Sequence, residues 1–176
     1  MGISDATAPP PATLVVMGVS GCGKSVIGAA LARRLGWRFL EGDTLHASAS
    51  VAKMAAGTPL SDEDRREWLL RLQQNITSAR ADNLPLVLSC SALKRCYRDV
   101  LRGGDAKLVL LYLDGDAALI ATRLQQRVDH FMPPGLLTSQ LRDLEPPGED
   151  EHHVRLDPAD APAALVEQAV HKLGLR

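Results

Sequence analysis

The sequence is poor in cysteine and in aromatic residues, and it has almost no net charge. Its three cysteines, Cys22, Cys90 and Cys96, are too few and too scattered for a disulfide framework or a Cys-x-x-Cys metal site. A formal net charge of -1 provides no field that attracts nucleic acid or an anionic membrane. No apolar run approaches the roughly 18 residues that span a bilayer, and no signal segment opens the chain. These absences favour a cytoplasmic protein in which any anion is bound by a local site.

The length and composition indicate a single domain. With 176 residues, of which 45% are hydrophobic, the chain can bury one core without disulfides or a structural metal. We expect residues 1–12, which contain three consecutive prolines, to be a disordered leader, and residues 13–176 to form the domain.

The most specific motif is Gly-Val-Ser-Gly-Cys-Gly-Lys-Ser at 18–25, which follows an apolar run at 14–17. Its glycines allow backbone N–H groups to surround phosphate groups, and the helix that begins near Lys24 adds its positive dipole end. Lys24 is expected to reach the β- and γ-phosphates, and the Ser25 hydroxyl to ligate Mg2+. The predicted nucleotide-binding residues of this segment are Gly18, Ser20, Gly21, Cys22, Gly23, Lys24, Ser25 and Val26.

The hydrophobic pattern predicts an α/β fold. Strand-like runs at 14–17, 37–40, 86–88, 108–113 and 154–156 alternate with helical patterns, which is typical of a parallel sheet of five strands covered on both faces by helices. Ligands of such sheets gather at the carboxyl ends of the strands.

Two segments interrupt the alternation. The first, at 45–80, has a short helical stretch, a Gly57-Thr58-Pro59 break and a long helix that Ser61 and Asp64 are expected to cap. The second has Arg123 and Arg127 four residues apart, followed by a proline-rich stretch, and it predicts a mobile lid over phosphates at about 123–147.

Charged residues near the strand ends predict an acceptor site for phosphoryl transfer. Asp43 follows the second strand and is expected to orient an acceptor hydroxyl and take its proton, or to bind Mg2+ through water. The cations Lys53, Arg65, Lys94 and Arg98 suit an acceptor that carries a carboxylate. The third strand runs into Ser89-Cys90-Ser91 without the usual Walker B carboxylate, which argues against motor proteins and ATPases, and the absence of Asn-Lys-x-Asp argues against a GTPase.

Longer motifs resemble the bacterial-type gluconokinases from about Leu14 to the final helix. Besides the phosphate loop, they are Glu-Gly-Asp-x-Leu-His at 41–46, Lys-Met at 53–54, Gly-x-Pro-Leu at 57–60, Asp-Glu-Asp-Arg at 62–65 with Trp68, Cys-Ser-Ala-Leu-Lys at 90–94, Tyr-Arg-Asp at 97–99, Arg123-Leu124, Arg127, His-Phe-Met-Pro-Pro at 130–134, Leu137, Ser-Gln at 139–140 and Leu-Glu at 144–145. The resemblance implies Mg2+-assisted transfer of the γ-phosphate of ATP to the 6-hydroxyl of D-gluconate. It also implies a shikimate and nucleoside monophosphate kinase-like P-loop fold and a homodimer.

The resemblance also implies roles for single residues. Asp43 becomes the base, or the group that orients the hydroxyl, and Lys24 and Arg127 neutralise the transferred phosphoryl group. Arg123 stacks on adenine or contacts its phosphates, and Pro158 borders the adenine. The residues expected to bind gluconate are Asp43, His46, Lys53, Arg65, Lys94 and Arg98.

Some positions depart from the family pattern, and two other functions stay open. The stretch 47–52 lacks the Pro and Asn that the family often shows. Val128 and Asp129 stand where the family usually has Lys or Gly. A shikimate kinase-like or other small-metabolite kinase uses the same scaffold with similar cations. A regulator that binds ATP without transferring phosphate is an alternative of another class, although it has no need of Lys24, Ser25, Asp43 and Arg127 together.

Overall fold

The computed structural model describes residues 11–127 and 133–176 and contains a parallel five-stranded sheet. Its strands are β1 (Thr13–Met17), β2 (Arg38–Glu41), β3 (Leu86–Ser89), β4 (Val109–Leu113) and β5 (His153–Leu156). Their order is β2-β3-β1-β4-β5, and every neighbouring pair is parallel. All five predicted strands are confirmed, with boundaries shifted by one residue at most.

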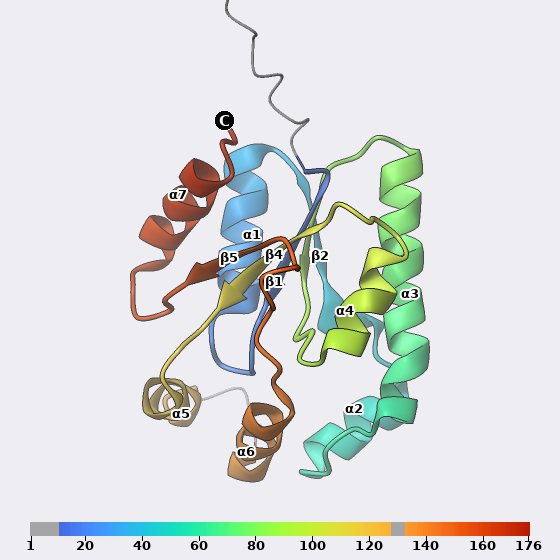
Figure 1. The fold of residues 1–176 in the computed structure, drawn as a ribbon. Coiled ribbons are helices and arrows are strands. Elements are labelled where there is room, and N and C mark those ends of the chain that lie inside the picture. Colours follow the sequence, from blue (N-terminus) through green and yellow to red (C-terminus); the bar gives the residue numbers. More distant parts are fainter. Residues whose placement is uncertain (1–10, 128–132) are drawn as a thin grey trace, which may run out of the picture.

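The helices in this part of the chain are α1 (Lys24–Leu35), α2 (Ser48–Ala55), α3 (Asp62–Ala81), α4 (Arg95–Arg102), α5 (Ala117–Gln125), α6 (Pro134–Asp143) and α7 (Pro162–Lys172), with a 3-10 turn at Gly42–Leu45. As Figure 1 shows, α1 and α7 lie on one side of the sheet and α3 and α4 on the other. The predicted α/β fold with helices on both faces is therefore confirmed.

Two hydrophobic clusters fill the spaces between the layers. Strand β1 divides its side chains between them, because successive residues of a strand point to opposite faces. Leu14 and Val16 pack in the cluster with Leu31 of α1, whereas Val15 and Met17 pack in the cluster with Leu72 of α3. All five residues of β1 are buried, which suits the central strand of a parallel sheet covered on both faces.

The helix boundaries follow the capping signals of the sequence. Gly36 ends α1 in the left-handed conformation with φ 66°, as its position after Leu35 predicts. The Ser61 hydroxyl accepts a hydrogen bond from the Asp64 N–H, and the Asp64 carboxylate accepts one from the Ser61 N–H. This reciprocal pair confirms the predicted capping box at the start of α3.

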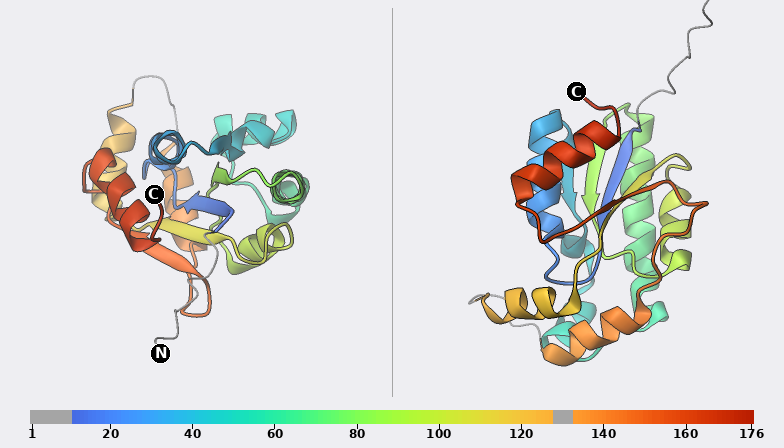
Figure 2. Two further views of the ribbon diagram at one scale, coloured as in Figure 1. Left: turned by 90° about the horizontal axis from the view of Figure 1, so that it is seen from above. Right: turned by 60° about the vertical axis from the view of Figure 1, so that its left-hand side comes forward.

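The carboxyl ends of the strands face the helices α2, α5 and α6, which lie together at one end of the molecule (Figures 1 and 2). The C-terminus lies at the opposite end (Figure 1). None of the helices in the described ranges is long and apolar enough to cross a membrane. Because ligands of parallel sheets bind at the carboxyl ends of the strands, we expect the functional side chains where β1, β2 and β3 end.

Candidate active site

The phosphate loop connects the end of β1 to the start of α1, as its sequence predicts. Gly21 has φ 84° and Gly23 has φ 102°, a region of backbone conformation that side chains disfavour. A Cβ at Gly21 would also lie 2.7 Å from Leu124 Cγ of α5, so this glycine lets the loop approach the helix. The loop is thereby held between the sheet and α5, with its N–H groups at the N-terminus of α1.

The side chains of Lys24 and Ser25 are placed to contact the phosphates and the metal ion of a bound nucleotide. The Lys24 ammonium donates a hydrogen bond to the Val19 carbonyl at 3.0 Å, so it lies folded over the loop. Ser25 is exposed, and within the described ranges its hydroxyl forms no hydrogen bond. A phosphate group can replace the Val19 carbonyl as the partner of Lys24, while Ser25 is open to a metal ion.

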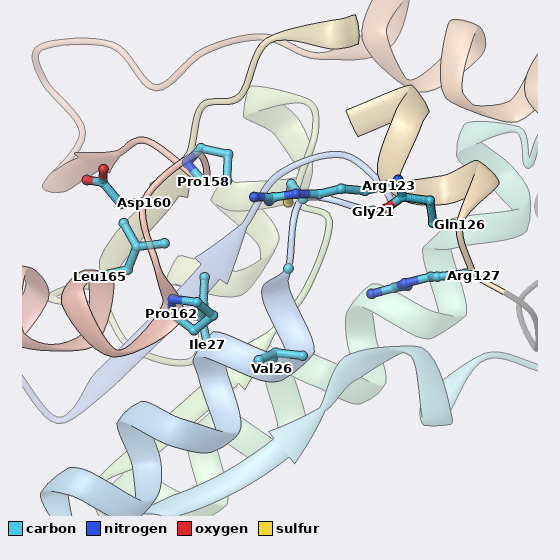
Figure 3. Close-up of a pocket in the computed structure, with 12 residues that line it drawn as sticks. Gly21, Val26, Ile27, Arg123, Gln126, Arg127, Pro158, Asp160, Pro162 and Leu165 are labelled. Carbon is cyan, nitrogen blue, oxygen red and sulfur yellow. The ribbon is translucent and has the colours of Figure 1, made fainter. Parts of the chain in front are cut away.

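A pocket of ≈ 330 Å³ adjoins the loop and has both apolar and cationic walls. Figure 3 shows Arg123 and Arg127 reaching into it from the α5 side, opposite Pro158 and Val26. The structure thus brings together most of the predicted nucleotide-binding residues: Gly21, Cys22, Gly23, Val26, Arg123, Arg127 and Pro158. Sequence reasoning missed the other lining residues, Ile27, Gln126, Asp160, Pro162 and Leu165.

The missed residues of the pocket follow from the topology. Pro162 and Leu165 belong to α7, which contacts α1 across the same face of the sheet. Their sequence signal is ordinary, a proline at a helix start and a helical leucine. Only the placement of β5 at the sheet edge next to β4 brings them beside the phosphate loop. The apolar walls and two guanidinium groups suit a purine ring and phosphates.

The acceptor side begins where β2 ends. A Cβ at Gly42 would lie 2.2 Å from the Ser89 carbonyl oxygen, so only glycine allows this approach of β2 to β3. The indole N–H of Trp68 donates to the Gly42 carbonyl at 2.8 Å, and the Ser89 hydroxyl donates to the Glu41 carboxylate. These bonds fix the turn that carries Asp43, whose side chain is 66% exposed and open to a ligand.

His46 lies against Asp43 in a buried position. Its ring stacks on Trp68 with centroids 4.1 Å apart, and its side chain is 5% exposed. Burial lowers the pKa of His46, the Asp43 carboxylate 3.7 Å away opposes this, and Arg65 adds to the lowering. His46 is therefore neutral near pH 7, and its Nδ1 has no hydrogen-bond partner in the described part of the chain.

Two of the predicted substrate cations pair with carboxylates at the start of α3. Lys53 contacts Asp64 at 2.7 Å and Lys94 contacts Asp62 at 2.9 Å. The Tyr97 hydroxyl also donates to Asp62, and its bond, together with that of Lys94, lowers the pKa of this carboxyl. A hydrogen bond from Lys53, together with the capping bonds of Ser61, lowers the pKa of Asp64 to about 2. A ligand carboxylate has to compete with these partners.

Arg65 is the predicted cation that differs, because no hydrogen bond or ion pair of its side chain is found in the described ranges. It is 7% exposed, its Nε has no partner there, and its guanidinium carbon lies 5.5 Å from the centre of the Tyr97 ring. Burial raises the pKa of the neighbouring Cys90 thiol to about 12, and the charges of Asp43, Lys24 and Arg65 all act on it.

The structure contradicts the prediction that Arg98 binds the substrate. Its side chain is 1% exposed, and its Nε and Nη2 donate to the two oxygens of Glu151 at 2.8 and 2.9 Å. Its Nη1 donates to three backbone carbonyls within 3.1 Å. The guanidinium is thus engaged inside the protein and has no face left for a ligand.

The predicted lid contains the end of α5 and all of α6. Gln140 of α6, which sequence reasoning did not select, accepts a hydrogen bond from the Ser20 N–H of the phosphate loop at 2.7 Å. After α6, the Glu145 N–H donates to the Leu93 carbonyl at 2.8 Å, so the C-terminal end of the predicted lid is attached to the core. Val128-Asp129 and His130-Phe131-Met132 lie outside the described residues.

Comparison with known proteins agrees with this geometry. A family model described as an AAA domain matches residues 14–147. A gluconokinase of Gluconobacter oxydans (strain 621H) is 46% identical over 160 residues, which cover 91% of this chain and 90% of that protein. The crystal structure of a gluconokinase from Sinorhizobium meliloti 1021 has a TM-score of 0.85 at 42% identity and covers 95% of this chain and 94% of that one. A shikimate kinase from Bacteroides thetaiotaomicron has a TM-score of 0.67 at 16% identity, over 93% of this chain and 98% of that one, and shows the fold alone.

Proposed function

The chain belongs to the gluconokinase family of P-loop kinases, and we propose that it transfers the γ-phosphate of ATP to the 6-hydroxyl of D-gluconate. The observation that carries this proposal is that the phosphate loop with Lys24 follows β1 and the exposed Asp43 follows β2, at the same edge of the parallel sheet. A phosphate-binding cation and a carboxylate at one edge of the sheet are what in-line transfer to an acceptor hydroxyl requires.

The donor side binds ATP through the phosphate loop and the pocket between α1, α5 and α7. Arg123 lies against the adenine or its phosphates, and Pro158 borders the ring. Lys24 leaves the Val19 carbonyl for the β- and γ-phosphates. Mg2+, when held by the exposed Ser25 hydroxyl, supplies charge neutralisation at the phosphate oxygens. Arg127 adds a positive charge from the lid side.

The acceptor side orients the hydroxyl and holds the sugar acid. Asp43 accepts the proton of the 6-hydroxyl as its oxygen bonds to the γ-phosphorus, while the bond from that phosphorus to the bridging oxygen breaks and ADP leaves. Neutral His46 offers a hydrogen bond to a substrate hydroxyl, and Arg65 and Lys94 attract the carboxylate. Lys53, which is paired with Asp64, contributes positive charge at the rim.

Two further expectations belong to the same proposal. The protein acts in the cytoplasm without nucleic acid or membrane partners, and it forms a homodimer. The net charge of -1 supports the first expectation, and the family resemblance supports the second.

The proposal is tested by measuring ADP release in a coupled assay with Mg2+ and ATP. Gluconate, shikimate, related sugar acids, nucleoside monophosphates and a sample without acceptor are compared. Turnover selective for gluconate is the expected result. Selective turnover of shikimate or another metabolite would keep the kinase and overturn its substrate, whereas ATP binding without turnover of any acceptor would indicate a regulator.

A further inference from the structure

Arg98 connects two segments of the active site that are far apart in the sequence. Its Nη1 donates to the carbonyls of Ala92 and Leu93 at 3.0 and 3.1 Å, and to that of Glu145 at 3.0 Å. The first two carbonyls lie in the loop between β3 and α4, and the third lies just after α6. We call residues 90–94, between β3 and α4, the acceptor loop. A single buried guanidinium therefore holds the acceptor loop against the end of the predicted lid.

The loop held by Arg98 touches both halves of the reaction site. The Gly18 N–H of the phosphate loop donates to the Ser91 carbonyl at 3.3 Å, and Lys94 ends the loop as the residue before α4. Ala92, between them, is buried and has φ 46°, a left-handed conformation that costs an alanine about 1 kcal/mol. The hydrogen bond from Arg98 to the Ala92 carbonyl helps to hold this conformation.

The charge of Arg98 is balanced by Glu151, which is buried to the same degree. The Glu151 carboxylate accepts from Arg98 through both oxygens and also from Arg102 and from the Gly148 N–H. Arg102 thus shares the carboxylate, but no bond from it to a backbone carbonyl is found in the described ranges. Of the two arginines, Arg98 therefore bonds to the backbone of the acceptor loop, whereas Arg102 contacts carboxylates.

Glu145 forms two further hydrogen bonds between the end of the predicted lid and the segment 93–95. Its N–H donates to the Leu93 carbonyl, and its carboxylate accepts from the Arg95 N–H at 2.6 Å, at the start of α4. An acidic group at this end also suits the helix dipole. Glu145, two residues after α6, is thereby bonded to the same loop as Arg98 and to the start of α4.

We propose that Arg98 is a positioning residue for phosphoryl transfer, which sets the acceptor loop and the end of α6 relative to the phosphate loop. It acts through the carbonyls of Ala92, Leu93 and Glu145 and not by contact with the substrate. The kcat measurement for this role rests on the proposed function. The hydrogen-exchange measurement rests only on the contacts of Arg98.

The test compares Arg98→Lys with Arg102→Lys, which disturbs the same carboxylate but none of the three carbonyls. Because displacement of reacting groups by about 1 Å can cost on the order of a hundredfold in rate, we expect a loss of this size in kcat for Arg98→Lys. ADP binding should stay within about threefold of the wild type, since Ala92, Leu93 and Glu145 do not line the nucleotide pocket. Arg102→Lys should change kcat by no more than about threefold.

Hydrogen exchange provides the readout that does not need a substrate. Peptides that cover 90–94 and 133–145 should exchange faster in Arg98→Lys and remain protected in Arg102→Lys. Glu151→Gln, which keeps Arg98 but removes the charge of its partner, should increase exchange in the same peptides and serves if Arg98→Lys does not fold.

The outcomes separate the two proposals. Unchanged exchange in a folded Arg98→Lys or Glu151→Gln variant would overturn the positioning role. Equal losses of kcat in Arg98→Lys and Arg102→Lys would do so as well, because they would reflect general destabilisation. If the wild type does not turn over gluconate, the proposed function fails, and the exchange comparison still decides the role of Arg98.

Discussion

At the scale of single residues, Asp43 combines an exposed carboxylate with a rigidly held backbone. Gly42 and Trp68 fix the turn, and buried His46 lies against the carboxylate. Asp43→Asn keeps the shape of the side chain but removes the proton acceptor. We expect kcat to fall by at least about a hundredfold while ATP affinity stays nearly constant, as a group acting on the acceptor hydroxyl requires.

The measurement is steady-state kinetics together with ATP binding by calorimetry. Asp82→Asn is the matched control, because Asp82 is exposed at the C-terminal end of α3. A collapse of ATP affinity with little change in kcat would instead assign Asp43 to the metal site.

Lys24 is the second residue whose role can be tested directly. Its ammonium donates a hydrogen bond to the Val19 carbonyl, and we expect a phosphate group to take the place of that carbonyl. Lys24→Ala should raise the activation free energy by about 3 kcal/mol or more, as expected for groups that stabilise charge in the transition state. Turnover is compared with Lys107→Ala, an exposed lysine away from the phosphate loop. Near-normal turnover of Lys24→Ala would refute its assignment to the transferred phosphoryl group.

At the scale of elements, α3 depends on its capping box. Ser61 and Asp64 satisfy each other's N–H groups, and Asp64 also holds Lys53. Ser61→Ala should lower the free energy of unfolding by about 1 kcal/mol, because an N-cap hydrogen bond is lost. Urea denaturation measures this effect. Ser78→Ala, exposed in the same helix, should be neutral or slightly stabilising. Equal effects of the two changes would contradict a specific capping contribution.

Prediction from the sequence succeeded where the signal was local. The strands follow from short apolar runs, and the cap of α3 follows from residues three positions apart. Arg98 was misassigned because its partner Glu151 is 53 positions away, and nothing near Arg98 indicates that it is buried. Gln140 belongs to a motif of the family resemblance but was given no role for the same reason, since it meets Ser20 from 120 positions away. Contacts of this kind are decided by packing.

At the scale of the whole molecule, the Arg98–Glu151 pair links stability to pH. Burial alone would raise the pKa of Glu151, but hydrogen bonds from Arg98, Arg102 and the Gly148 N–H outweigh it and lower the pKa to about 2 from 4.5. A carboxyl with a lowered pKa in the folded state stabilises the protein fully above pH 4.5, and this contribution is lost as the pH falls toward 2.

Glu151→Gln should therefore be less stable than the wild type by about 3 kcal/mol at pH 7, because a buried arginine loses its charged partner. The difference should shrink as the pH falls from 4.5 toward 2. Urea denaturation at a series of pH values measures it, with exposed Glu149→Gln as the control. A difference that does not depend on pH would contradict the assignment of this pH dependence to Glu151.

The order of the strands has a consequence for synthesis of the chain. The acceptor side uses residues from β2 to α4, whereas the nucleotide pocket needs the phosphate loop together with Pro158, Pro162 and Leu165. A chain growing on the ribosome therefore contains the residues of the acceptor side before Pro162 and Leu165, which complete the nucleotide pocket, have been added. We therefore expect the complete nucleotide pocket to form only after α7 has been synthesised.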